Sequence, residues 1–169
     1  WKLAGELALR RMAPMEAIGH LTHGLTVAES LPAGSAQDEY ILEFKTLLGT
    51  SWLTVAGWAH PQVWSNYRPA LDLANALDRV DLLAPIYMAL WVNVMCNGRI
   101  AESLSWAAEA LTSAKTRNDS ALEVVAHMAM MVSNFWLGRL DATAQHADIV
   151  KRIHDDEKHA TILSYANQD

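Results

Sequence analysis

Two stretches of this chain share one pattern: an apolar helical segment ends at Gly-Arg, and a new helical segment follows at once. The glycines of the pair, Gly98 and Gly138, lie 40 residues apart, and another long apolar segment stops near Gly57. A repeat of this length is typical of stacked helical hairpins, because one hairpin cannot bury its apolar face alone. The repeat therefore predicts an all-α array, a kind of architecture that binds partners more often than it catalyses.

Apolar residues recur with the helical period over most of the chain, and the alternation typical of strands is absent. Pro14 and Pro61 suit first helical turns, and Gly98 suits a left-handed helix end. Ser35 and Ser120 each resemble the start of a capping box. These signals predict eight helices in four hairpins, over residues 1–34, 35–80, 81–118 and 119–154, followed by a tail at 155–169 of unassigned structure.

Composition and charge exclude several classes of protein. The net charge is −6 and no run of Lys and Arg is longer than two, which argues against a nucleic-acid surface. The most apolar run, 82–96, contains Pro85 and Asn93 and is too short to span a membrane. Cys96 is the single cysteine, so an internal disulfide is impossible, and a reducing, cytoplasmic location is expected.

The first hairpin resembles the tetratricopeptide repeat, whose signature combines Trp and Leu-Gly in one helix with Ala and Phe in the next. Trp1 and Gly5 take first-helix positions, and Ala17, Leu21 and Gly24 take second-helix positions. The repeat here is longer than the about 34 residues of that family, so HEAT-like repeats remain the alternative. Either resemblance implies a right-handed α-solenoid of about four hairpins.

A more specific resemblance covers nearly the whole chain. The segments 1–8, 16–25, 31–32, 47–49, 89–91, 135–138 and 163–169 are similar to the tetratricopeptide-like C-terminal region of large bacterial signalling proteins. In those proteins a class III adenylate/guanylate cyclase domain precedes an AAA-type ATPase module and then this helical region. The same tail follows ATPase modules in some transcription regulators.

The resemblance implies a non-catalytic regulatory module that binds a protein, a peptide or other domains of the same chain. The alternative is a small-molecule-sensing region of an ATPase-type transcription regulator. Because the chain opens on Trp1 and closes in a stretch that forms no complete hairpin, we expect it to be a piece of a longer protein, whose own activity could be that of a nucleotide cyclase.

The sequence holds no phosphate-binding loop, no nucleophile elbow and no His-Glu-x2-His motif. We therefore expect no catalytic residue, cofactor or metal in this segment. Glu16, His20 and His23 share a helical face at a spacing that Zn²⁺ could use, but they lack a fourth ligand. A polar outer face of the array is the favoured interpretation.

Aromatic residues recur at helical spacing and are mostly expected to pack between helices. Trp58 and Trp64 flank the irregular link at 59–61, so exposure is expected there first. The whole aromatic set consists of Trp52, Trp58, Trp64, Tyr67, Trp91, Trp106 and Trp136.

In tetratricopeptide-like arrays the first helix of each hairpin lines the concave surface, and this resemblance implies a partner-binding groove. Its first half is polar and its second half is apolar. A contiguous apolar patch seldom faces water, so a peptide, another repeat or a second copy in a homodimer should cover it; otherwise these residues are core. The groove residues are Lys2, Glu6, Arg10, Thr46, Thr50, Thr54, Met88, Val92, Met95, Met128, Val132 and Phe135.

Overall fold

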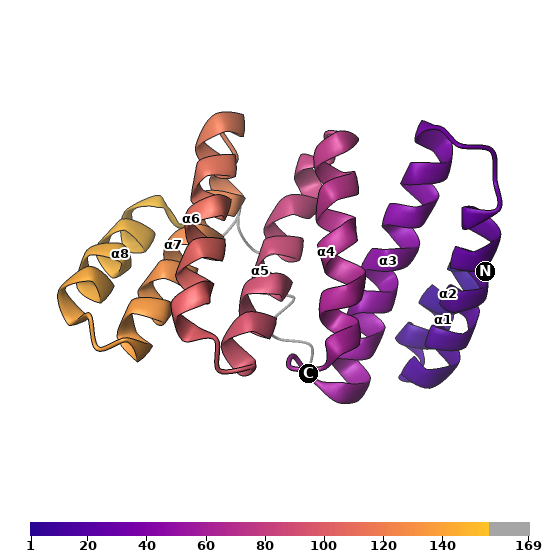
Figure 1. Ribbon diagram of the computed structural model, residues 1–169, viewed down its shortest axis with the longest axis horizontal. Coiled ribbons are helices and arrows are strands. Elements are labelled where there is room, and N and C mark those ends of the chain that lie inside the picture. Colours follow the sequence, from indigo (N-terminus) through magenta and orange to yellow (C-terminus); the bar gives the residue numbers. More distant parts are fainter. Residues whose placement is uncertain (156–169) are drawn as a thin grey trace. The chain divides into compact units, whose positions relative to one another are not determined.

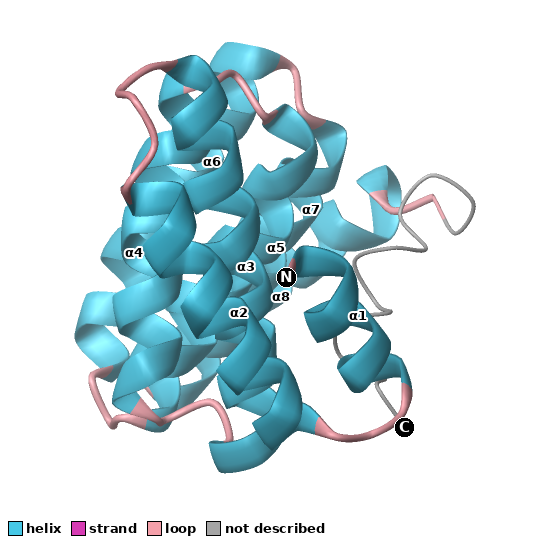
Figure 2. Cartoon of the chain, turned by 90° about the vertical axis from the view of Figure 1, so that its right-hand side faces the viewer, coloured by secondary structure: helices cyan, strands magenta, loops and turns pink. Residues whose placement is uncertain are grey.

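The computed structural model describes residues 1–155 and contains eight α-helices and no strand in that range (Figures 1 and 2). The all-α prediction is confirmed for this part of the chain. Apart from Asp155, the predicted tail at 155–169 lies outside the described residues. The helices are α1 (Lys2–Arg10), α2 (Pro14–Glu29), α3 (Ser35–Ala56), α4 (Pro61–Ala76), α5 (Val80–Cys96), α6 (Ile100–Arg117), α7 (Ser120–Trp136) and α8 (Leu140–Ile153).

The chain divides into two compact units, Trp1–Arg79 and the part from Val80 onward. In the first unit each helix packs against the next, and α1 also contacts α3. The second unit repeats this pattern with α5 to α8, and α5 also contacts α7. Each unit therefore contains two hairpins whose first helices are in contact. The ribbon shows that successive helices within each unit run antiparallel (Figure 1).

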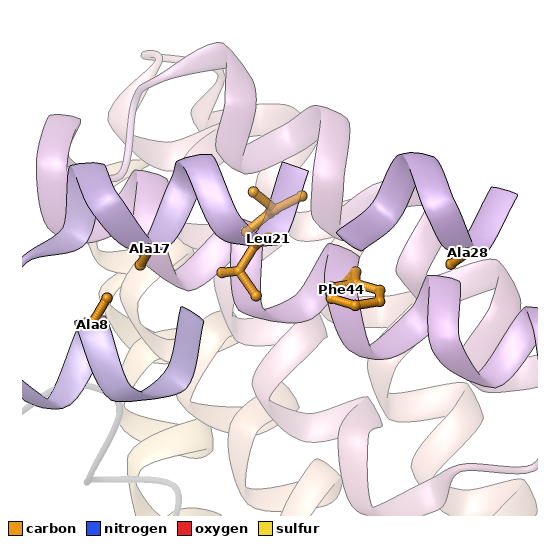
Figure 3. Close-up of a cluster of buried hydrophobic side chains, with 6 residues drawn as sticks. Ala8, Ala17, Leu21, Ala28 and Phe44 are labelled. Atoms are coloured by element: carbon orange, nitrogen blue, oxygen red, sulfur yellow. The ribbon is translucent and has the colours of Figure 1, made fainter. Parts of the chain in front are cut away.

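One cluster of buried side chains in the first unit lies between α1, α2 and α3 (Figure 3). On α2, Ala17, Leu21 and Ala28 are buried at helical spacing. Ala8 from α1 and both Phe44 and Leu48 from α3 complete the cluster. The alanines allow close helix contact while Leu21 and Phe44 fill the remaining space, so truncation of Leu21 to Ala should cost about 2–5 kcal/mol.

The core of the second unit is formed by α5, α6 and α7. Leu90 and Val94 on α5 and Leu122 and Val124 on α7 are fully buried. By contrast, α8 has no buried residue. This helix is therefore held by partly exposed contacts with α7, the neighbour against which it packs.

The helix ends confirm some sequence signals and correct others. Gly98 and Gly138 have φ of 74° and 71°, the left-handed conformation expected at these stops. The capping box predicted at Ser120 is wrong, because the N-cap of α7 is Asp119, whose Oδ1 accepts a hydrogen bond from the amide of Leu122 at 3.0 Å. The preceding Asn118 adopts φ of 53° to end α6, which leaves Asp119 as the extended residue before α7.

The capping box predicted at Ser35 is wrong as well, since the N-cap of α3 is Gly34, which has no side chain that could accept a cap hydrogen bond. Pro14 and Pro61 do begin their helices, as expected. Within residues 1–155, every helix falls short of the length or the apolar character that crossing a bilayer requires.

Candidate interaction surface

The α1 part of the predicted groove is polar and partly engaged within the unit. Lys2 Nζ forms a salt bridge with Glu43 Oε1 of α3 at 2.9 Å, and both side chains are partly exposed. Glu6 is half-buried and Arg10 is exposed. The ion pair ties α1 to α3, so part of the charge expected to meet a partner is neutralised by the chain itself.

The three groove threonines on α3 direct their hydroxyl groups back to their own helix. Thr46, Thr50 and Thr54 each donate to the carbonyl four residues earlier, at 2.8, 3.1 and 3.0 Å. The Thr50 hydroxyl also lies 2.9 Å from the hydroxyl of Tyr67, a buried residue of α4. Because these donors are occupied, the threonines offer a partner mainly their methyl groups and the remaining acceptor capacity of their oxygens.

The apolar part of the predicted groove is also a packing layer of the second unit. Met88, Val92 and Met95 of α5 and Val132 of α7 are half-buried. All four pack against one buried cluster, formed by Trp91, Ala107 and Ala129. The structure brings these four predicted residues together, but their side chains pack mainly against the interior of the unit.

The last two groove residues differ from each other. Met128 is half-buried on α7. Phe135 is 55% exposed, near the C-terminal end of the same helix. Its ring lies edge-on to that of Trp136, with the ring centroids 5.8 Å apart and the planes at 79°. Phe135 is therefore the predicted apolar groove residue most available to a partner.

Sequence reasoning missed most of the apolar surface around Phe135. Trp136 is 65% exposed and Leu140 is 63% exposed. These two residues and Phe135 lie within six consecutive positions across the α7–α8 turn, and we call the three the turn patch. The sequence did contain a signal for this exposure, since Phe135 and Trp136 are adjacent. Adjacent residues of a helix point about 100° apart and cannot both face one core.

The other expected aromatic positions are more conventional. Trp91 is buried, and Trp52 stacks on His60 with ring centroids 5.0 Å apart, so both pack as predicted. Trp58 and Trp64, expected to be the exposed aromatic residues, are half-buried. Aromatic side chains are thus more exposed at the α7–α8 turn than at the α3–α4 link, where the exposure was expected.

A chain of buried hydrogen bonds fixes α5, α6 and α7 beneath the apolar layer. Trp91 Nε1 donates to Ser133 Oγ at 3.0 Å, and the Ser133 and Ser103 hydroxyl oxygens lie 2.6 Å apart. Ser103 in turn donates to the carbonyl of Ile100 at 2.7 Å. Since Ser103 uses its one hydrogen there, Ser133 donates to Ser103 while it accepts from Trp91.

The structure also places the metal-like set of the first unit. His20 Nε2 lies 3.5 Å from Glu16 Oε1, while the indole of Trp1 lies against the rings of His20 and His23, with centroids 5.9 and 4.3 Å apart. Over residues 1–155 no group of three or more His, Cys, Asp or Glu side chains is arranged to hold a metal ion. The three residues are therefore better described as a polar and aromatic face around Trp1.

Comparisons of the chain with family models, curated proteins and solved structures found no match.

Proposed function

We propose that this chain is a non-catalytic helical-repeat module of a larger bacterial signalling protein, in which it regulates a cyclase or ATPase output by binding a protein, a peptide or another domain. Its proposed fold is a right-handed, tetratricopeptide-like α-solenoid, with HEAT-like repeats as the alternative. The contacts of α1 with α3 and of α5 with α7 support this proposal, since in repeat arrays each hairpin covers the next.

The turn patch is the observation on which the binding proposal depends. Phe135, Trp136 and Leu140 are each more than half exposed. Covering the exposed part of the two aromatic rings, about 100 Å² each, would yield about 5 kcal/mol at roughly 25 cal/mol per Å². Aromatic side chains of this kind commonly supply most of the energy of an interface.

That gain is comparable with the cost of association, which is at least about 4 kcal/mol. The turn patch alone would therefore bind weakly, and neighbouring groove residues must add contacts. Met128 and Val132 are placed to do so, because they belong to the same helix as Phe135 and retain partial exposure. Methionine suits such a surface, because its flexible thioether adapts to different partners.

The proposal is tested by photo-crosslinking in bacterial cells that express the longer protein. A benzoylphenylalanine residue is introduced at position 135, and adducts are identified by mass spectrometry. The expected result is a recurring adduct with one protein or with one domain of the same protein. Binding is then measured by calorimetry with the purified partner and the triple variant Phe135→Gln/Trp136→Gln/Leu140→Gln, which should bind at least about tenfold more weakly.

A matched control removes an equal number of exposed apolar side chains from the first unit. Leu3, Met12 and Met15 are also more than half exposed. The variant Leu3→Gln/Met12→Gln/Met15→Gln should keep the affinity of the original chain, and both variants should keep its helical content. Equal loss of binding in the two variants, or the absence of any specific adduct from position 135, would refute the proposal.

The small-molecule sensor is the alternative function. It requires the apolar layer of α5 and α7 to enclose a ligand, whereas Met88, Val92 and Met95 pack against the cluster around Trp91. This packing favours the interaction proposal. Native mass spectrometry distinguishes the two functions, because a sensor should retain a small molecule. Thermal melting gives a second measurement, since a ligand of the sensor should raise the melting temperature.

A further inference from the structure

Two histidines meet at the contact between α7 and α8. His127 is buried on α7, and His146 is half-buried on α8. Their Nδ1 atoms lie 3.0 Å apart, and their ring centroids are 5.2 Å apart with the planes tilted by 34°. At this distance the two nitrogens share one hydrogen, so one ring donates from Nδ1 and the other accepts there.

This arrangement depends on the protonation of both rings. The donor ring can take up a proton on its Nε2 and keep the hydrogen bond, but it then carries a charge at a buried or half-buried position. A second proton occupies the accepting Nδ1, so that two N–H groups of two cations face each other. Both steps oppose the contact, and the second abolishes the hydrogen bond.

The charged groups around the pair do not cancel this effect. Burial lowers the pKa of His127, and His146 lowers it further. Glu123 on α7 acts in the opposite direction, while Lys115 on α6 adds to the lowering of that pKa. The pKa of His146 is also lowered by burial.

The other elements at this contact place their charges toward solvent. The one charged side chain of α5, Asp81, is exposed. The charged side chains of α8 are all exposed too, and they are Asp141, Asp148, Lys151 and Arg152.

The contacts that hold α8 against α7 are made, on the α8 side, by partly exposed side chains. This helix has no buried residue, and the hydroxyl of Thr143 donates to the carbonyl of Met131 on α7 at 3.4 Å. Because no residue of α8 is fully buried, we expect this helix to be among the less stable elements, which open without global unfolding. The histidine contact is therefore a polar link that helps to hold α8 against α7.

We propose that the His127–His146 pair is a proton-binding site that controls the docking of α8 on α7, with α8 docked at neutral pH and released in acid. The proposal goes beyond the proposed function and does not rest on it. It would, however, connect acidity to the turn patch, because Leu140 of that patch is the first residue of α8.

The direction of the pH effect on docking follows from the lowered pKa values of the two histidines. A histidine in the undocked helix should titrate near its ordinary pKa of about 6.5. Because docking lowers the pKa of both rings, the undocked state binds more protons once the pH falls below about 6.5. The docking equilibrium should then weaken by up to about tenfold per pH unit for each histidine, until the pH reaches the lowered pKa of the docked state.

Amide hydrogen exchange of the full chain at pH 7.5 and pH 5.5 tests the proposal. Protection factors are corrected for the intrinsic pH dependence of exchange, and α6, which contains no histidine, serves as internal reference. The expected result is a drop of at least about tenfold in the protection of α8 relative to α6 at the lower pH. In the variant His127→Asn/His146→Asn, whose amides can replace the Nδ1 contact without titrating, this drop should disappear.

The variant His23→Asn is the matched control, since it removes a histidine of the first unit and should leave the acid response of α8 unchanged. An NMR titration of the unaltered chain gives a second measurement, which does not depend on any variant, and it should yield a pKa below 6.5 for both His127 and His146. An unchanged α8 protection at pH 5.5, a drop that persists in the double Asn variant, or a pKa at or above 6.5 for both rings would each overturn the proposal.

Discussion

Removal of the Ser133 hydroxyl gives a quantitative test of the buried hydrogen-bond chain in the second unit. Ser133 is fully buried on α7 and accepts the indole N–H of Trp91, whose side chain is also buried. In Ser133→Ala this donor loses its acceptor in a site closed to water. Ser103 keeps its bond to the carbonyl of Ile100, so a single orphaned donor remains.

The expected cost follows from these contacts. An unsatisfied buried donor costs about 1–3 kcal/mol. The higher helix propensity of Ala offsets a few tenths, about 0.5 kcal/mol at most. Removing one oxygen atom leaves almost no cavity, so Ser133→Ala should lower the free energy of unfolding by about 1–2 kcal/mol. Urea unfolding followed by far-ultraviolet circular dichroism measures this change.

A double-mutant cycle separates the hydrogen bond from other effects of the substitution. Trp91→Phe removes the N–H donor, so in that background Ser133→Ala should cost less than about 0.5 kcal/mol. Ser105 lies exposed on α6, and Ser105→Ala should stay within about 0.5 kcal/mol of the original chain. An equal cost of Ser133→Ala in both backgrounds would show that the bond to Trp91 does not stabilise the unit.

Two further predictions concern single positions in the two units. A Cβ at Gly49 would lie 2.5 Å from Cε2 of the buried Tyr67, so Gly49→Ala should destabilise the chain by about 1–3 kcal/mol. Gly19 has open space around the position of a Cβ, so Gly19→Ala should stabilise the chain by up to about 1 kcal/mol. The denaturant midpoints of the two variants should therefore shift in opposite directions. Asp119→Ala removes the bond to the Leu122 amide and should cost about 1 kcal/mol, while Asp119→Asn should retain most of the cap; amide exchange in the first turn of α7 should report the difference.

Helix positions were accessible from the sequence because their signals are local. Proline at the first turns of α2 and α4 and glycine at the ends of α5 and α7 act through backbone conformation within a few residues. The buried face of α4 follows from spacing alone, since the apolar residues Val63, Tyr67, Ala70, Leu71 and Ala74 recur at helical spacing and are all buried. The misplaced cap of α7 shows the limit of this reasoning, because Asp119 and Ser120 are both good caps and the left-handed turn at Asn118 selected Asp119.

The candidate surface was only partly predictable, because exposure depends on which distant side chains arrive beside a residue. The sequence placed Met88 and Phe135 in one apolar groove, yet the cluster around Trp91 covers much of Met88 and leaves Phe135 more than half exposed. No spacing rule indicated that the rings of His127 and His146 would meet, because their contact joins two helices across a turn.

The amino-acid order of this chain thus determined where the helices begin and end and which stripe of each one is apolar, since both follow from short-range backbone and side-chain preferences. Tertiary packing alone decided which apolar residues became interior and which face water, and which polar groups pair. The physical reason is that burial and pairing depend on neighbours that folding brings together. The local sequence pattern carries no information on which residues many positions away become those neighbours.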